Sequence, residues 1–188
     1  TIISELLKAA GYTVHLGGNI GHPLLCETPL MKENDIAVLE LSSFQLHSMP
    51  CRPSVSVITN ISPNHLDKHK DYADYIDAKK SIYRMQREDD VLVLNADDAL
   101  TPEFAAEALS QKRLISVCKE VQDGVFCRDG VISRAEGGVY TPIMRSDEIL
   151  LPGVHNCMNY MAAFAATAGL VPDEICRQVA ASFKGVEH

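Results

Sequence analysis

The clearest hydrophobic pattern in the chain is a series of short apolar runs, each followed by polar residues. Residues 36–39 form one such run, which ends at the carboxylate of Glu40 and continues into Ser42, Ser43 and Gln45. A run of this kind predicts a strand buried on both faces, and polar residues at its carboxyl end would lie in the crevice where open α/β sheets bind ligands. Glu40 is therefore a candidate site residue, although a glutamate at a strand end is often only a rim charge.

The same pattern predicts the remaining elements. Further strands are expected at residues 11–16, 54–59, 91–95 and 114–117. Helices are expected at residues 2–10, 22–30, 71–86, 96–109, 156–168 and 172–183. The alternation of strands and helices predicts an α/β fold with a mainly parallel sheet flanked by helices. Between residues 121 and 151, short β-type runs separated by Asp-Gly and Gly-Gly turns predict a small antiparallel subsheet attached to that sheet.

Two loops carry candidate ligand-binding residues. Residues 17–21 hold three glycines, which indicate either a simple turn or a place where the backbone approaches a ligand closely. In the loop at residues 60–69, His65, Asp67 and His69 alternate along the chain. One of them is a reasonable metal ligand, because a neutral imidazole suits several divalent ions. The alternative is a loop with surface histidines.

Lys79 has an unusual place in the predicted helix at residues 71–86. Helical spacing puts it on the same stripe as the apolar residues, whereas Lys80 points about 100° away. A buried stem with an exposed ammonium is the ordinary explanation. A ligand-contacting or chemically modified amine is the alternative.

Asn156 and Asn159 are three residues apart at the start of an Ala-rich helix, so they share one face of its first turn. Asn156 on its own would be an ordinary N-cap residue.

Composition excludes several classes of protein. The chain has 188 residues with a formal net charge of -8, which argues against a nucleic-acid-binding protein, because such a protein needs a basic face. An acidic protein that handles phosphates needs metal ions to mediate the contact. No apolar run reaches the roughly 20 residues that span a bilayer, and no secretory signal pattern is present. We expect a cytoplasmic protein in which most of the six cysteines are reduced packing residues.

Five segments in this order resemble the central ATP-binding domain of the Mur ligases, whose core is similar to that of P-loop NTPases. The resemblance extends over the whole chain and is carried by the segments GGNIGHP, LELSSFQL, NISPNHLDKH, DAKKSIY and LPGVHNCMN. The first two favour the member of the family that adds D-glutamate to UDP-N-acetylmuramoyl-L-alanine. This resemblance implies ATP-dependent amide-bond formation through an acyl phosphate, in peptidoglycan precursor synthesis.

The resemblance also implies roles for individual residues. The ligands of the magnesium ions (Mg2+) in the family correspond to Glu40, His65 and, as its carbamate, Lys79. Residues near the muramoyl-alanine substrate and the metal correspond to Asn19, Ser42 and Gln45. The pair that contacts the adenine of ATP corresponds to Asn156 and Asn159. One departure is Asn64, where the family commonly has an aspartate before the metal-binding histidine.

The resemblance further implies that this is the middle domain of a longer protein. The family's phosphate-binding loop and its N-terminal UDP-binding domain would precede Thr1, and its C-terminal ligase domain would follow His188. We therefore expect the chain to be inactive alone. Three alternatives stay open, namely another Mur or folylpolyglutamate-type ligase, a metal-dependent phosphoesterase, and a non-catalytic binding module.

Overall fold

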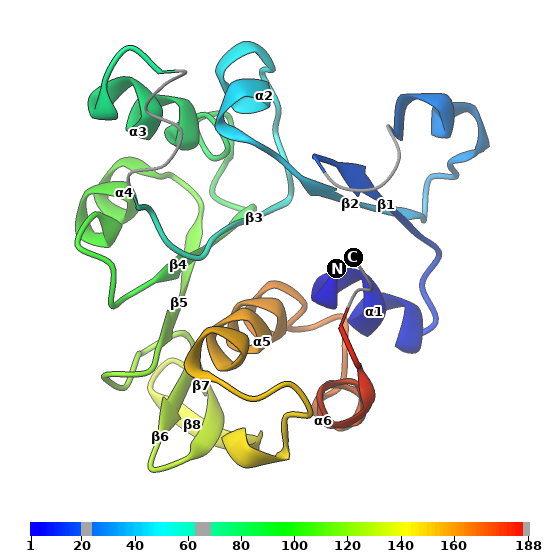
Figure 1. The fold of residues 1–188 in the computed structure, drawn as a ribbon, viewed down its shortest axis with the longest axis vertical. Helices are drawn as coiled ribbons and strands as arrows, with labels where there is room; N and C mark the ends of the chain where they lie inside the picture. The colour runs from blue at the N-terminus through cyan, green and yellow to red at the C-terminus, as the bar shows by residue number, and fades with distance from the viewer. Residues whose placement is uncertain (20–23, 63–68, 186–188) are drawn as a thin grey trace.

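The structure is a computed structural model that describes residues 1–19, 24–62 and 69–185. It is an α/β fold with two sheets (Figure 1). The strands are β1 (Val14–Gly18), β2 (Ile36–Glu40), β3 (Val55–Ile58), β4 (Val91–Asn95), β5 (Gln111–Ser116), β6 (Gly124–Arg128), β7 (Val131–Glu136) and β8 (Val139–Arg145). The α-helices are α1 (Ile2–Ala9), α2 (Ser43–Ser48), α3 (Tyr72–Lys80), α4 (Thr101–Glu107), α5 (Val154–Ala166) and α6 (Asp173–Ser182). Three 3-10 helices lie at Leu24–Cys26, Thr28–Leu30 and Ser146–Glu148.

The larger sheet has six strands in the order β3-β4-β5-β6-β7-β8. Strands β3 to β6 pair in parallel, and β7 and β8 continue the sheet as antiparallel strands. This arrangement confirms the predicted mainly parallel sheet with an antiparallel part between residues 121 and 151. The Asp-Gly turn between β6 and β7 has both residues at positive φ, with Asp129 at 50° and Gly130 at 76°, as a tight hairpin requires.

Strand β4 lies at the centre of the hydrophobic core and is buried on both faces. Val91 and Val93 pack with α5 and its neighbours, whereas Leu92 and Leu94 pack in a second cluster with Phe104 of α4. Alternate residues of a strand point to opposite faces, so this strand separates two layers of helices. Its continuous apolar run was therefore a correct signal of a strand covered on both sides.

Strand β2 does not have the burial that its apolar run predicts. Among the described residues it pairs only with β1, in a separate two-stranded parallel sheet, and Leu39 is 48% exposed. In Figure 1 the β1–β2 sheet stands apart from β3. The prediction of burial on both faces was wrong because an apolar run does not report whether the described chain supplies a second neighbouring strand.

Several helices are shorter than predicted, for local reasons. Helix α3 ends at Lys80, and the turn that follows lets Tyr83 pack against Phe104. Helix α4 begins at Thr101, because the Asp98 carboxylate instead accepts the N–H of Leu100 in the preceding turn. Ser, Asn and Asp side chains compete with helix formation in this way. The predicted helix at residues 22–30 is replaced, in its described part, by two 3-10 helices.

Candidate functional site at the ends of β1 and β2

The carboxyl ends of β1 and β2 bring two of the candidate residues together. Gly18 faces Glu40 in the parallel register, and the N–H of Asn19 donates a 2.7 Å hydrogen bond to the Glu40 carbonyl oxygen. Gly18 has a φ of +108°, and a Cβ atom there would lie 2.2 Å from the same carbonyl oxygen. The glycine is therefore required for the close approach of the two strands, and it places Asn19 beside Glu40.

The carboxylate of Glu40 is exposed and is not used to stabilise the fold. Within the described residues it accepts no hydrogen bond and forms no ion pair within 4 Å. It does interact electrostatically with the ammonium of Lys79 and with the amino group of Thr1 at the start of α1. An oxygen ligand with a negative charge and no protein partner fits a hard cation such as magnesium.

Lys79 lies in the last turn of α3, and its amine interacts electrostatically with the Glu40 carboxylate. Its Nζ lies 5.8 Å from the ring centroid of Tyr75, within the range of a cation–π contact. Burial lowers the pKa of the Lys79 amine, and the Glu40 carboxylate opposes this effect without cancelling it. A lowered pKa increases the neutral fraction of the amine, which is the form that reacts with carbon dioxide to give a carbamate.

The neighbouring Lys80 has a different environment. Its Nζ lies 2.5 Å from Glu103 and 2.6 Å from Glu107, both on α4. Burial lowers the pKa of Lys80, but the hydrogen bonds to the two carboxylates outweigh it and raise the pKa overall. As the helical spacing indicated, the two lysines have different partners, and of the two it is Lys79 whose pKa responds to Glu40.

Ser42 and Gln45 lie together at the start of α2, where they form a capping box. The N–H of Gln45 donates to Ser42 Oγ at 3.3 Å, and the N–H and hydroxyl of Ser42 donate to Gln45 Oε1 at 2.9 and 3.0 Å. Within the described residues the Gln45 amide nitrogen makes no hydrogen bond. The two side chains thus have a structural role that the sequence interpretation missed, although the S-x-x-Q spacing is a capping signal.

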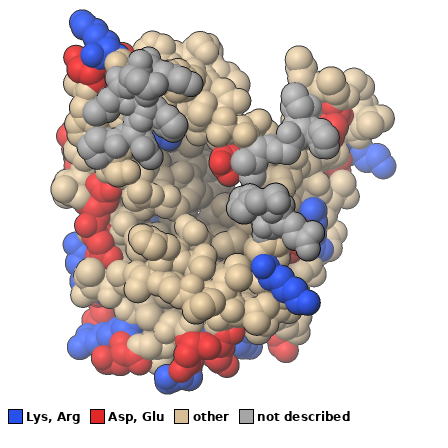
Figure 2. Space-filling view, viewed as in Figure 1, with Lys and Arg blue, Asp and Glu red and all other residues tan. Residues whose placement is uncertain are grey.

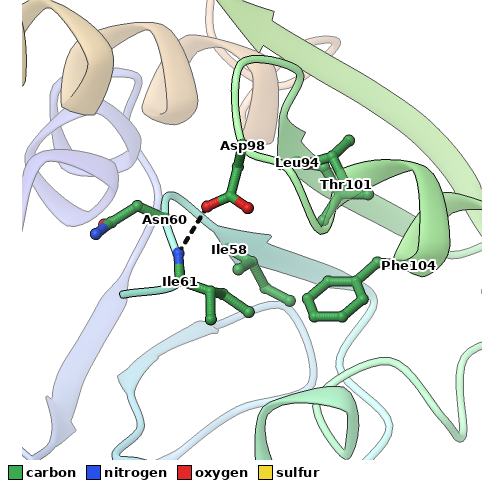
Figure 3. A pocket seen from close by; sticks show the side chains of 7 residues that line it. All are labelled: Ile58, Asn60, Ile61, Leu94, Asp98, Thr101 and Phe104. Carbon is green, nitrogen blue, oxygen red and sulfur yellow. Dashed lines mark hydrogen bonds between the residues drawn. The ribbon is translucent and has the colours of Figure 1, made fainter. Parts of the chain in front are cut away.

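The predicted metal-binding His65 lies outside the described residues, as do Asn64 and Asp67. The chain on both sides of this segment is anchored. Before it, the N–H of Ile61 donates a 2.9 Å hydrogen bond to Asp98, which Figure 3 shows beside a small pocket lined by Ile58 and Phe104. After it, His69 is buried and contacts Ser43 and Asp74. Among the described residues, no group of three or more His, Cys, Asp or Glu side chains is placed to bind a metal.

Asn156 and Asn159 both lie in the first turns of α5, but Asn156 is not its N-cap residue. That position belongs to Gly153, and Asn156 instead donates a 3.0 Å hydrogen bond to the Pro152 carbonyl oxygen. Asn159 is exposed. Within the described chain, no hydrogen bond or ion pair joins either asparagine to Glu40 or Lys79, so the adenine-contacting pair remains a prediction.

The face that carries these residues is hollowed. Figure 2 shows a depression between the α2–α3 region and the β1–β2 sheet, with few charged side chains on its visible floor and most of the charge around the outline of the molecule. A carboxylate at the end of a strand and an interacting lysine of lowered pKa, on a mainly parallel α/β fold, are typical of proteins that bind ligands beyond the carboxyl ends of their strands.

Comparison with known families identifies the class further. The family model of the Mur ligase middle domain matches residues 1–167, and the chain belongs to this family. Over the whole chain it is 46% identical to the UDP-N-acetylmuramoylalanine–D-glutamate ligase of Acetivibrio thermocellus and 47% identical to that of Ruminiclostridium cellulolyticum. It spans 40% of the length of each of these relatives.

Solved structures agree on the fold. A UDP-N-acetylmuramoyl-L-alanyl-D-glutamate–2,6-diaminopimelate ligase superposes on the whole chain with a TM-score of 0.77 and 19% identity. MurF from Acinetobacter baumannii does so with a TM-score of 0.70 and 18% identity. The chain covers 44% of each of these proteins, so the α/β architecture described above is shared with a part of each of them.

Proposed function

We propose that this chain is the central domain of an ATP-dependent ligase that joins D-glutamate to UDP-N-acetylmuramoyl-L-alanine in the synthesis of peptidoglycan precursors. The observation that carries the proposal is the match of about 46% identity over all 188 residues to enzymes of that name. The placement of Glu40 and Lys79 at one sheet edge supports it, because the free carboxylate and the amine are what the chemistry needs there.

The reaction would begin with transfer of the ATP γ-phosphoryl group to the terminal carboxylate of the muramoyl-alanine substrate. The amine of D-glutamate would then attack the acyl phosphate, forming the amide bond with release of phosphate. Both steps concentrate negative charge on phosphoryl oxygens, and bound magnesium would neutralise it. Glu40 and His65 would hold the ions, and the carbamate of Lys79 would add a further oxygen ligand.

The remaining candidate residues would position the two large substrates. Asn19, beside Glu40, and the free amide nitrogen of Gln45 would lie close to the muramoyl-alanine substrate, with Ser42 holding Gln45 in place. Asn156 and Asn159 would contact the adenine of ATP.

No helix in the described part of the chain has the length and apolar character to cross a bilayer. A cytoplasmic location, where ATP and UDP-linked precursors occur, follows from the proposed reaction.

We further propose that a phosphate-binding loop and its strand precede Thr1 in the full protein. Two features support this. The edge of β2 that does not face β1 is unpaired within the described chain and leaves Leu39 exposed, and β3 is likewise an edge strand of the larger sheet. The start of α1 lies close enough to Glu40 for the Thr1 amine to interact with its carboxylate. A strand inserted between β2 and β3 would complete one parallel sheet and deliver its loop to the amino end of α1.

The test is ADP release by the full-length protein with ATP, magnesium, UDP-N-acetylmuramoyl-L-alanine and D-glutamate. We expect release only when both acceptor substrates are present, and no release from the isolated chain of 188 residues. Replacement of D-glutamate by L-alanine or a diamino acid distinguishes a ligase that adds D-glutamate from other members of the family. Activity with one of those, and none with D-glutamate, would assign the domain to another ligase.

A further inference from the structure

Three buried or half-buried side chains from different segments form a continuous hydrogen-bonded chain next to the proposed site. Ser43 Oγ lies 2.8 Å from His69 Nε2, and His69 Nδ1 lies 3.0 Å from Asp74 Oδ2. The order serine, histidine, aspartate is that of a hydrolase triad. Ser43 is only 3% exposed and the His69 side chain 2%, so the serine hydroxyl is closed to a substrate. The arrangement is therefore not a nucleophilic centre.

The hydrogen bonds fix the orientation of the imidazole. The hydrogen bond from His69 is the main reason that the pKa of Asp74 lies below its usual value, so the carboxylate is ionised and acts only as an acceptor. Nδ1 must then donate its proton to this carboxylate, and Nε2 shares a hydrogen bond with the hydroxyl of Ser43. The ring stacks on Phe44 at a centroid distance of 4.8 Å and meets Tyr75 edge-on at 5.4 Å. The two hydrogen bonds and the two ring contacts together hold the imidazole in this orientation.

This imidazole connects the two helices that carry candidate site residues. Ser43 is the first residue of α2, directly after Ser42, and Asp74 lies in the first turn of α3. Lys79 follows Asp74 by five positions on the same rigid helix, a rise of about 7.5 Å. A shift of the start of α3 relative to α2 would therefore be transmitted to the Lys79 amine and would change its separation from Glu40.

We propose that His69 is a positioning residue that sets the distance and orientation of Lys79 relative to Glu40 by bridging Ser43 and Asp74. This inference rests on the proposed function, since it concerns the geometry of that same site. The bridge formed by His69 therefore affects kcat and the magnesium concentration for half-maximal rate, in addition to any effect on folding.

The test replaces His69 in the full-length enzyme by a ring that packs but does not hydrogen-bond. His69→Phe keeps the contacts with Phe44 and Tyr75 and removes both polar bonds. We expect kcat per folded molecule to fall by about 10- to 100-fold, as displaced catalytic geometry causes, and the magnesium concentration for half-maximal rate to rise several-fold. We expect KM for ATP to change by less than about threefold, because the adenine pair on α5 is remote from the bridge in sequence and contacts. Circular dichroism on melting measures the folded fraction.

A second variant covers the case in which His69→Phe does not fold. Ser43→Ala removes one hydroxyl and leaves the imidazole paired with Asp74, and it should lower kcat about 10-fold with the same rise in magnesium requirement. Ser182→Ala is the matched control, because Ser182 is an exposed serine at the end of α6 whose hydroxyl donates only to Gln178 of its own helix, and it should leave kcat unchanged.

The outcomes separate the two proposals. A working wild-type ligase whose folded His69→Phe and Ser43→Ala variants keep kcat and magnesium dependence within about threefold overturns the positioning role and leaves the proposed function intact. A wild-type enzyme that forms no amide bond overturns the proposed function and, with it, the positioning role. A purely structural bridge would lower the melting temperature without moving the magnesium dependence.

Discussion

The N–H of Asn19 donates a 2.7 Å hydrogen bond to the carbonyl oxygen of Glu40, across the ends of two parallel strands. This bond and the register between Gly18 and Glu40 hold the candidate metal ligand at a fixed place on the sheet edge. The position of the carboxylate therefore depends on how closely β1 approaches β2, and this approach depends on the residue at position 18.

Gly18→Ala should displace Glu40. A Cβ atom at position 18 would lie 2.2 Å from the Glu40 carbonyl oxygen, and the φ of +108° is unfavourable for any side chain. We expect the backbone strain alone to lower the free energy of unfolding by about 1–3 kcal/mol, with a further loss from the steric conflict. Ligase activity of the full-length enzyme at limiting magnesium should fall by at least 10-fold, measured as ADP release.

Gly11→Ala is the matched control for this substitution. Gly11 also has a positive φ, of +91°, but no atom lies within 4 Å of the position where its Cβ would be. We expect a comparable cost of backbone strain and no change in magnesium dependence. Equal effects of the two substitutions on magnesium dependence would contradict a specific role for the contact between Gly18 and Glu40.

Substitution of the two adjacent lysines by methionine should separate catalysis from stability. Lys79→Met keeps an unbranched side chain on the Tyr75 ring and removes the amine, so kcat should fall by about 100-fold or more if the carbamate serves as a metal ligand. Lys80→Met removes the ion pairs with Glu103 and Glu107 and should lower stability while changing kcat by less than about threefold. Carbon-13 NMR of full-length enzyme supplied with labelled bicarbonate should give a carbamate signal that Lys79→Met abolishes.

Some of this site could be predicted from local sequence and some could not. The strand that ends at Glu40, the helix that carries Lys79 and the different direction of Lys80 all follow from periodicity over a few residues. The isolation of the β1–β2 sheet does not, because the neighbours of a strand are decided by chain segments far away. Its exposed Leu39 is a consequence of tertiary arrangement that an apolar run cannot report.

The roles of polar residues were harder to predict from the sequence, because the same side chain can stabilise the fold or bind a ligand. Ser42 and Gln45 have the spacing of a capping box and also the place of site residues, and the structure shows the cap. His69 had no local signal that separated it from a surface histidine, because its partners Ser43 and Asp74 come from two helices. Only the packing of α2 against α3 reveals the bridge.

His15 should make the stability of the chain depend on pH near neutrality. Its imidazole lies 2.9 Å from Asp35 and 3.1 Å from Glu27, and these hydrogen bonds, that of Asp35 first, raise the pKa of His15 above its usual 6.5. Since the folded-state pKa is raised, the stabilisation is complete below about pH 6.5 and is lost as the pH rises through the folded-state pKa.

The measurement compares melting temperatures of wild type and His15→Gln from pH 6 to pH 9. We expect the wild type to lose its advantage over the variant progressively as the pH increases, and an NMR titration of His15 should show a midpoint above 6.5. Glu27→Gln should move that midpoint downward by removing the weaker partner. A wild-type advantage that is constant over this pH range would show that the cluster acts through neutral hydrogen bonds alone.

Arg113 should contribute to stability by donating hydrogen bonds to backbone carbonyl groups at and just after the end of α5. Its Nη1 donates to the carbonyl oxygens of Ala165 at 2.8 Å and Ala168 at 3.4 Å, where a helix has no backbone donors of its own. Hydrogen bonds from a charged donor are worth about 1.5–3 kcal/mol, so Arg113→Met should lower the free energy of urea unfolding by that amount with an unchanged m-value. Arg128→Met is the control, because Arg128 is 63% exposed and exposed ion pairs such as that with Glu120 contribute about 0–1 kcal/mol. A loss for Arg113→Met no larger than for Arg128→Met would mean that water satisfies these carbonyl groups equally well.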